Sequence, residues 1–250
     1  MPTVPAPPAP ADRRTLTEEV LVVLALSLLA SAVYAILSLL SAPLRGVVVA
    51  AGNQSNEFIR QIVGFAFGLA PVFLVVHLVR RTGEGLGAIG LGARDLRRDA
   101  FGGVALFAVV GAAGAGIYLG SVALGVNRFV VPVPPMGHWW TVPALILNGA
   151  EAALVEEVIA LGYLVTRLEQ LGASPGAAVG ASAVLRGSYH LYQGWGGFVG
   201  NLAMGLLFGA IFVRRRRTWP FVLAHFLLDV GAGVVYLLVR ERLPGFFSSA

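Results

Sequence analysis

The amino-acid sequence contains no cysteine and no lysine, and only 12% of its 250 residues are charged. Without cysteine, the chain can form no disulfide bond and has no thiol nucleophile. Because lysine is absent, all 18 basic residues are arginine. An ordinary soluble domain has about 25% charged residues, whereas here 57% of the residues are hydrophobic and the mean hydropathy is +0.79. This composition excludes a typical water-soluble domain and indicates a membrane protein.

Long apolar stretches recur along the chain and are separated by clusters of arginine, proline and glycine. A helix needs about 20 apolar residues to cross a hydrocarbon layer of about 30 Å. The sequence lacks the short alternating segments that are typical of membrane β-barrels. We therefore predict an all-α fold, a polytopic transmembrane helix bundle of about seven spans. The predicted spans are residues 19–40, 57–79, 100–124, 142–168, 174–191, 195–213 and 218–239.

The sequence divides into three parts. Residues 1–18 are rich in proline and alanine, and we expect a disordered cytoplasmic tail because such a segment buries too little apolar surface to fold. We expect N-terminal transmembrane helices over residues 19–125 and a catalytic membrane core over residues 142–240, in the four C-terminal helices. In this arrangement, most arginines fall in loops on the same side as the N-terminus, which predicts that the N-terminus is cytoplasmic.

Two features could point to nucleotide or nucleic-acid ligands. The segment Gly85–Gly90 has the glycine spacing of the dinucleotide-binding fingerprint, but it follows a membrane helix instead of a β-strand. The arginines, including the run Arg214–Arg217, lie at the ends of apolar spans. That placement is typical of topology anchors near anionic lipid. We therefore expect no nucleotide and no nucleic acid as partner.

Charged and histidine side chains occur inside three of the C-terminal spans. A charged residue at the centre of a membrane helix costs about 2.5–3.5 kcal/mol on insertion scales, so such residues usually face a bundle interior and mark function. They are Glu151, Glu156 and Glu157 in the fourth span, Arg186 and His190 in the fifth, and His225 and Asp229 in the seventh. A structural pairing of His225 with Asp229, and of Arg186 with a glutamate, would account for some of them. Taken together, these residue types on three helices indicate a functional site.

This set of side chains has the chemistry of peptide hydrolysis. A carboxylate can take a proton from water, a histidine can share that task or protonate the leaving amine, and a second histidine can stabilise an oxyanion. The set is also a candidate zinc site, through His190, His225 and Glu156. The sequence lacks the His-Glu-x-x-His helix of common zinc proteases, so zinc would have to be held across helices.

Three short motifs follow one another within residues 142–240. They are the pair Glu156-Glu157 with Gly162, the segment Arg186-Gly-Ser-Tyr-His190, and the segment His225-Phe-Leu-Leu-Asp229. In order, spacing and placement they resemble the motifs of the CPBP intramembrane proteases. That family includes the prenyl-protein CAAX endopeptidases and bacterial relatives linked to bacteriocin processing and self-immunity. Two positions depart from the family pattern, because Leu161 replaces an arginine and Arg186 replaces a phenylalanine.

The resemblance implies a role for each motif residue. The implied roles are water activation by Glu156 and His190, support of the oxyanion by His225 and Asp229, and support of the site by Glu157. The loss of the motif arginine at Leu161 removes a cation beside the glutamate pair. We expect Arg186 to reach that pair and to act in its place.

The sequence therefore predicts an integral protein of a bacterial plasma membrane that cleaves a membrane-associated peptide or protein. One alternative is a catalytically silent immunity or interaction protein of the same fold. A second is a proton-coupled transporter, which also uses intramembrane acidic and histidine residues. Transporters commonly contain internal repeats, but the first three spans have no counterpart of the three motifs.

Overall fold

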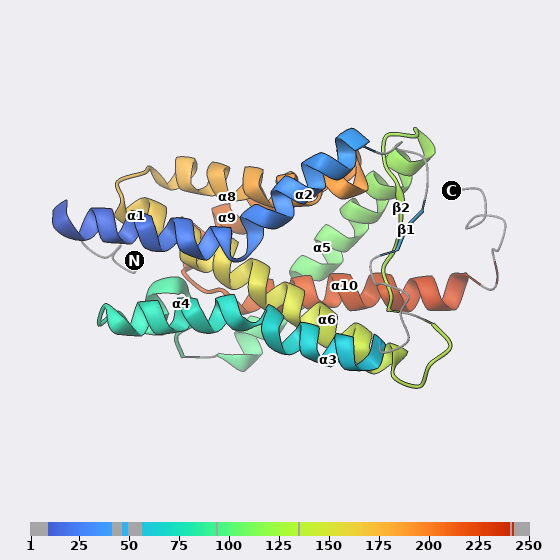
Figure 1. The fold of residues 1–250 in the computed structure, drawn as a ribbon, viewed down its shortest axis with the longest axis horizontal. Helices are drawn as coiled ribbons and strands as arrows, with labels where there is room; N and C mark the ends of the chain where they lie inside the picture. Colours follow the sequence, from blue (N-terminus) through green and yellow to red (C-terminus); the bar gives the residue numbers. More distant parts are fainter. Residues whose placement is uncertain are drawn as a thin grey trace.

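The computed structural model describes residues 10–41, 47–49, 57–93, 95–134, 136–240 and 242 of the chain. These residues form a helical bundle with one small sheet (Figure 1). In chain order, its elements are α1 (Pro10–Ala25), α2 (Leu28–Ser41), β1 (Val47–Val49), α3 (Glu57–Gly68), α4 (Ala70–Arg81), η1 (Leu86–Ile89), α5 (Leu96–Ala123), β2 (Phe129–Val131), α6 (Thr141–Glu156), η2 (Glu157–Leu164), α7 (Val165–Gln170), α8 (Pro175–Tyr189), η3 (Leu191–Gln193), α9 (Trp195–Arg215) and α10 (Trp219–Val239).

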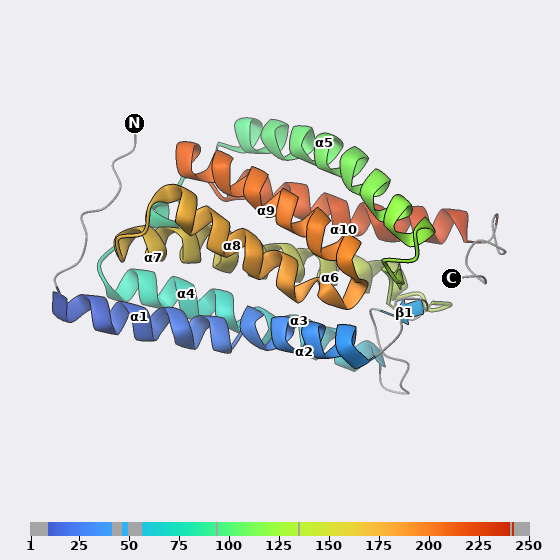
Figure 2. The same ribbon diagram turned by 90° about the horizontal axis from the view of Figure 1, so that it is seen from above.

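The helices are arranged in layers along the long axis of the bundle (Figure 2). On one side, α5 packs against α9 and α10. In the centre, α6 contacts α10 and α8 contacts α9. On the opposite side lie α1 to α4, with α2 against α8 and α3 against α6. The central helices, which carry the sequence motifs, are therefore covered on both sides.

The structure confirms the all-α class but not the number of spans. Four helical segments among the described residues are long and apolar enough to cross a membrane. They are Phe58–Arg81, Leu96–Ala123, Trp195–Arg215 and Trp219–Val239. The pair α1 and α2, bent by 48° at their junction, makes a fifth if it counts as one span. By length and composition the bundle thus has four or five spans, where about seven were predicted.

Two of the predicted spans, 174–191 and 142–168, are not among these segments. Segment 174–191 forms α8, which is only 15 residues long because Ser174 caps its start and His190 ends it. A helix of that length rises about 22 Å, which is shorter than the hydrocarbon layer of about 30 Å. Segment 142–168 is helical throughout, but it changes from α-helical to π-helical geometry after Glu156. The predicted boundaries of this helical segment agree with the structure, but the segment is not α-helical throughout.

The first helix begins earlier than the sequence suggested. Residues 10–18, which we expected within a disordered tail, are part of α1. Leu16 is buried in the bundle, and Arg13 Nη2 donates a hydrogen bond of 2.8 Å to the carbonyl of Leu171. These contacts fasten the start of α1 to the bundle, so this part of the expected tail is folded. Residues 1–9 of the expected tail lie outside the described residues.

Ion pairs join the helices at the end of the bundle where α9 turns into α10. They are Arg81–Glu19, Arg167–Glu84, Arg216–Glu169 and Arg217–Asp99. The parallel pair of β1 and β2 lies at the other end (Figure 1). The arginine-rich loops thus gather at one end, as a topology with arginines on one side of the membrane requires. That this side is the cytoplasm stays a prediction.

Small residues let α9 approach α8 closely. A Cβ atom on Gly205 would lie 2.9 Å from the Cα of Ala183, and one on Gly209 would lie 2.5 Å from the Cγ1 of Val179. Such distances are too short for a side chain, so glycine is required at both positions. Spacing of small residues by four is a common device of membrane helix packing. The close contact fixes α8, and with it the second motif, against α9.

Candidate active site

The two glutamates of the first motif lie where the central helix changes geometry. Glu156 ends α6, and Glu157 begins η2, a π-helical segment of eight residues. Such π-helical turns are rare and frequently mark functional sites. The side chain of Glu157 is fully buried, whereas 15% of the Glu156 side chain is exposed. The motif therefore supplies one interior carboxylate and one accessible carboxylate.

Groups from two other helices hold the Glu157 carboxylate. Arg186 Nη2, on α8, donates a hydrogen bond of 2.5 Å to Glu157 Oε1. His225 Nδ1, on α10, lies 2.7 Å from the same oxygen. A carboxylate in an apolar interior is tolerated only when it is paired and hydrogen-bonded. These three residues therefore link η2, α8 and α10 in the centre of the bundle.

Arg186 reaches the glutamate pair, as expected from the missing motif arginine. Leu161, which occupies the position of that arginine, is 2% exposed and belongs to an apolar cluster with Phe208 and Phe212. The cation comes from α8 instead. A Cβ atom on Gly205 of α9 would lie 3.3 Å from the Arg186 Cδ, so the absence of a side chain there makes room for the arginine.

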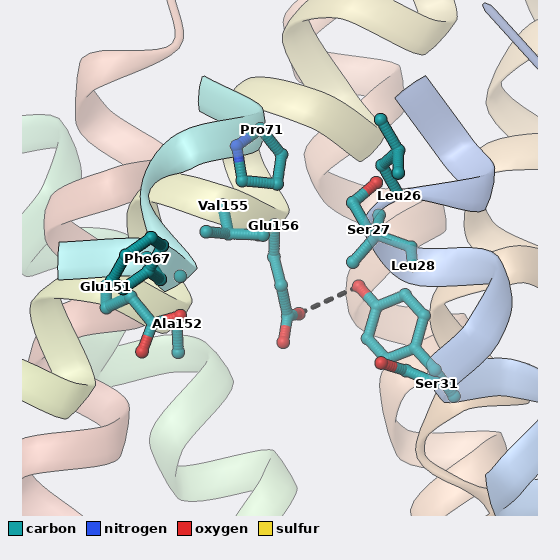
Figure 3. Close-up of a pocket in the computed structure, with 12 residues that line it drawn as sticks. Leu26, Ser27, Leu28, Ser31, Phe67, Pro71, Glu151, Ala152, Val155 and Glu156 are labelled. Carbon is teal, nitrogen blue, oxygen red and sulfur yellow. Dashed lines mark hydrogen bonds between the residues drawn. The ribbon is translucent and has the colours of Figure 1, made fainter. Parts of the chain in front are cut away.

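The Glu156 carboxylate points into the space between the residues that line the first pocket (Figure 3). Its Oε2 atom accepts a hydrogen bond of 2.8 Å from the Tyr189 hydroxyl, which the dashed line in Figure 3 marks. The same oxygen lies 3.8 Å from Arg186 Nη1. No group among the described residues hydrogen-bonds to the other oxygen, Oε1. That atom is available to a bound water molecule.

Two pockets meet at Glu156. The first, of about 330 Å³, lies between the α1–α2 break, the α3–α4 break and α6. The second, of about 470 Å³, lies between α2 and the end of α8, and it includes His190. Ser31, Glu156 and Tyr189 line both pockets. Because α2 forms a wall of each pocket, the site extends beyond the four C-terminal helices. We expected it to lie within those four helices.

His190 lies directly after the last residue of α8 and faces the second pocket. Its Nδ1 atom lies 2.9 Å from the backbone carbonyl of Arg186. Because a carbonyl oxygen can only accept, Nδ1 must carry the proton of this hydrogen bond, and Nε2 is the acceptor of the neutral ring. The sequence alone placed His190 near the outer end of a membrane span. The early end of α8 instead brings it into the same pocket as Glu156.

His225 and Asp229 of the third motif do not line either pocket. The Nδ1 atom of His225 is taken by Glu157, and its Nε2 atom lies 3.5 Å from Asp229 Oδ2. Both ring nitrogens therefore face carboxylate oxygens, which only accept hydrogen bonds when ionised. This geometry joins His225 to the interior glutamate and directs its second nitrogen toward Asp229.

The side chains proposed for zinc do not form a metal site. Within the described parts of the chain, no three histidine, aspartate or glutamate side chains are placed to hold a metal ion. Both nitrogens of His225 face carboxylates, and one nitrogen of His190 is bonded to a carbonyl. In addition, the guanidinium of Arg186 lies between the two carboxylates of the first motif, where it would repel a second cation. The donor set does not fit zinc.

Sequence reasoning missed two contributors to the site. Tyr189 bonds to Glu156, and Ser31 of α2 lines both pockets. A tyrosine beside a motif histidine and a serine in an apolar helix carry no distinctive sequence signal. Glu151, the third glutamate of the central helix, lines the first pocket only. It lies outside the cluster that joins Glu156 to the other motif residues.

The fold and the site define an integral membrane protein whose buried acidic, arginine and histidine residues lie beside pockets between helices. Residues 138–231 match the family model of the type II CAAX prenyl endopeptidase Rce1-like family. The matched segment includes all three motifs, and it confirms the resemblance to CAAX-type intramembrane proteases that the motifs indicated. No curated protein and no solved structure matches the chain.

Proposed function

We propose that the chain is an intramembrane endopeptidase that uses Glu156 and His190 to activate water against a peptide bond. One observation carries the proposal: the two side chains come from different helices and face the same pocket of about 470 Å³. A carboxylate and an imidazole that share an accessible cavity are suited to general acid–base catalysis. The match to a protease family over residues 138–231 supports the same reaction class.

The free atoms of these two residues define the first step. Glu156 Oε1 and, in the neutral ring, His190 Nε2 are both available as proton acceptors. Water held by them would lose a proton to the carboxylate as its oxygen forms a bond to the peptide carbonyl carbon. When the C–N bond breaks, the carboxylic acid of Glu156 returns this proton to the leaving amine. The products are a carboxylic acid and an amine, which exchange a proton to become a carboxylate and an ammonium group, and the enzyme regains its starting protonation state.

The interior residues position this machinery. Glu157 holds Arg186 and His225 through one oxygen atom. Asp229 faces the other nitrogen of His225. Arg186 in turn presents its main-chain carbonyl to His190 and its Nη1 atom toward Glu156. We propose that this chain of contacts fixes both water-activating side chains. His225 and Asp229 then act through Glu157, which differs from the oxyanion role that the family resemblance implied.

The substrate in this proposal is a peptide or protein that approaches from the bilayer. Both pockets are lined by residues of α2, a helix with many exposed apolar side chains. Polar backbone groups of a peptide are costly in hydrocarbon, so a pocket between helices is the place where an extended peptide could be bound. In Figure 1, α2 and α3 diverge toward the end at which β1 and β2 lie.

The substitution Glu156→Gln tests the proposal, because it keeps the size of the side chain and removes the base. The purified protein is reconstituted in liposomes with a library of membrane-spanning reporter peptides, and products are identified by mass spectrometry. We expect cleavage by the wild type and a rate lower by about 10²–10⁴-fold in the variant. Glu18→Gln, on the exposed face of α1, is the matched control and should cleave normally.

The same experiment separates the endopeptidase from a silent member of the family. The replacement of the motif arginine by Leu161 is the observation that favours a silent protein. If the wild type and Glu156→Gln give the same absence of products while the folded protein still captures peptides, the chain binds and does not cleave. That result would overturn the proposed function.

A further inference from the structure

Tyr189 lines both pockets, and its hydroxyl is bonded to the proposed base, Glu156. Tyr189 is the last residue of α8, is 6% exposed, and donates its hydroxyl proton to Glu156 Oε2 at 2.8 Å. It lines both pockets, and so does Glu156. A hydrogen-bond donor therefore lies next to the proposed base and faces the space that a peptide would fill.

A hydrolase also needs a donor for the negative charge that develops on the peptide carbonyl oxygen. The third motif supplies none to either pocket. His225 Nδ1 is bonded to Glu157, its Nε2 atom points toward Asp229, and neither His225 nor Asp229 lines the two pockets. The guanidinium of Arg186 is 2% exposed and lines neither pocket. The residues that the family resemblance assigned to the oxyanion thus lie outside the two pockets that Tyr189 lines.

We propose that Tyr189 is the catalytic residue that stabilises the oxyanion. This inference rests on the proposed endopeptidase function and adds to it a residue that the three motifs do not include. In the resting site, the tyrosine hydroxyl is held by the ionised Glu156. During water attack, the new C–O bond forms and the carbonyl π electrons move onto oxygen, while the water proton moves to Glu156.

The same proton transfer releases the tyrosine for its second task. A protonated carboxyl group is a weaker acceptor than an oxyanion, because hydrogen bonds to charged acceptors are the stronger ones. The tyrosine hydroxyl can then turn from Glu156 to the oxyanion, and its proton stays on the phenol. As the C–N bond breaks, the oxyanion returns its electron pair to the carbonyl, and the hydroxyl returns to Glu156. The interaction is made in the transition state and not in the ground state, which is the condition for raising kcat.

The test compares Tyr189→Phe with Tyr163→Phe, using a reporter peptide that the wild type cleaves. Tyr163 is a matched control because its hydroxyl is buried and makes no hydrogen bond within the described structure, and it lines neither pocket. We expect Tyr189→Phe to lower kcat by about 10²–10³-fold, the usual effect of losing one oxyanion donor, with KM changed less than about twofold. Tyr163→Phe should keep both constants.

A transition-state mimic distinguishes oxyanion stabilisation from mere positioning of Glu156. The probe is the same peptide with a phosphinate in place of the scissile amide, so that it presents a tetrahedral anionic oxygen. Tyr189→Phe should weaken phosphinate binding by the factor by which it lowers kcat/KM. Binding of the intact peptide, measured in the Glu156→Gln background, should change less than about twofold on adding Tyr189→Phe.

Two results would overturn the inference and leave the endopeptidase in place. One is an active Tyr189→Phe protein next to an inactive Glu156→Gln protein. The other is a lower kcat with unchanged phosphinate binding, which would make Tyr189 a positioning residue only. If the wild type cleaves no peptide, the proposed function fails first and the role of Tyr189 fails with it.

Discussion

Arg186 Nη2 lies 2.5 Å from Glu157 Oε1 in the interior of the bundle, and the pair joins α8 to the π-helical segment η2. The arginine side chain is 2% exposed and the glutamate side chain is fully buried. A buried pair of this kind gains little over an apolar replacement of both partners, but removal of one partner leaves an uncompensated charge. Removal of either Arg186 or Glu157 alone should therefore destabilise the fold more than replacement of both residues.

The first prediction is that Arg186→Met destabilises the protein by about 3–5 kcal/mol. The free energy of unfolding, measured by denaturant titration in mixed micelles, checks it. The double variant Arg186→Met with Glu157→Met should recover part of the loss, because it removes both charges of the pair but also takes the Glu157 partner from His225. Arg14→Met is the control, since its pair with Glu18 is largely exposed and such pairs contribute little. A single variant as stable as the wild type would contradict the prediction.

The second prediction concerns the relocated cation. Leu161 follows Glu157 by four residues in the same helical run, so an arginine there could approach the glutamate. Leu161→Arg alone should be destabilising, because it introduces a second cation into an apolar cluster. Leu161→Arg with Arg186→Phe restores the family pattern, and it should be more stable than the sum of the single effects by about 1–3 kcal/mol. A double-mutant cycle of unfolding free energies measures this coupling. A coupling near zero would show that an arginine at position 161 does not replace Arg186 as the partner of Glu157.

The third prediction concerns the contact of α9 with α8. Gly205→Ala should lower the thermal unfolding midpoint, because its Cβ would lie 2.9 Å from the Ala183 Cα and 3.3 Å from the Arg186 Cδ. The matched control is Gly200→Ala, whose Cβ would meet only Ile117 at an ordinary 3.7 Å. That variant should be neutral or more stable, because alanine favours a helix over glycine by about 1 kcal/mol. Equal midpoints for the two variants would show that the close approach has no energetic importance.

The fourth prediction concerns metal. The nitrogens of His225 are directed at carboxylates, and Arg186 supplies a positive charge beside Glu156, so we expect hydrolysis to proceed after metal removal. Activity should stay within about twofold after dialysis against EDTA and after treatment with 1,10-phenanthroline, since general acid–base catalysis needs no Lewis acid. Metal content of the purified protein, measured by mass spectrometry, provides an independent check. Loss of activity on chelation that returns with added zinc would refute the prediction.

The fifth prediction concerns orientation. Because the chain has no cysteine, single cysteines can report which side of the membrane each loop faces. Ala93→Cys lies in an exposed loop at the arginine-rich end, and Met136→Cys lies in an exposed loop at the other end. If arginine-rich loops face the cytoplasm, a membrane-impermeant maleimide should label position 136 in intact cells and position 93 only after lysis. The reverse pattern would invert the proposed topology.

Several features of the protein could be predicted without its tertiary structure. Composition was sufficient for the membrane class, since apolar stretches of the required length have no stable place in water. The spacing of Glu156, Glu157, His190, His225 and Asp229 was sufficient to indicate the resemblance that the family model over residues 138–231 also finds, because these residue types are costly in a membrane helix and stand in a distinctive order. Even the partner of Glu157 could be anticipated, because the loss of an arginine at position 161 made Arg186 the nearest replacement in the sequence pattern.

Other features depended on contacts between distant residues. The helical state of residues 10–18 follows from contacts such as Arg13 with Leu171, and no local pattern encodes them. Hydropathy could not show that α8 ends at Tyr189 and so is too short to be a span, because apolar residues look alike in a spanning helix and in a buried one. The direction of each polar side chain also needed the fold. Glu156 and Glu157 are adjacent in sequence, yet packing of α8 and α10 makes one interior and leaves the other facing the pockets with Tyr189.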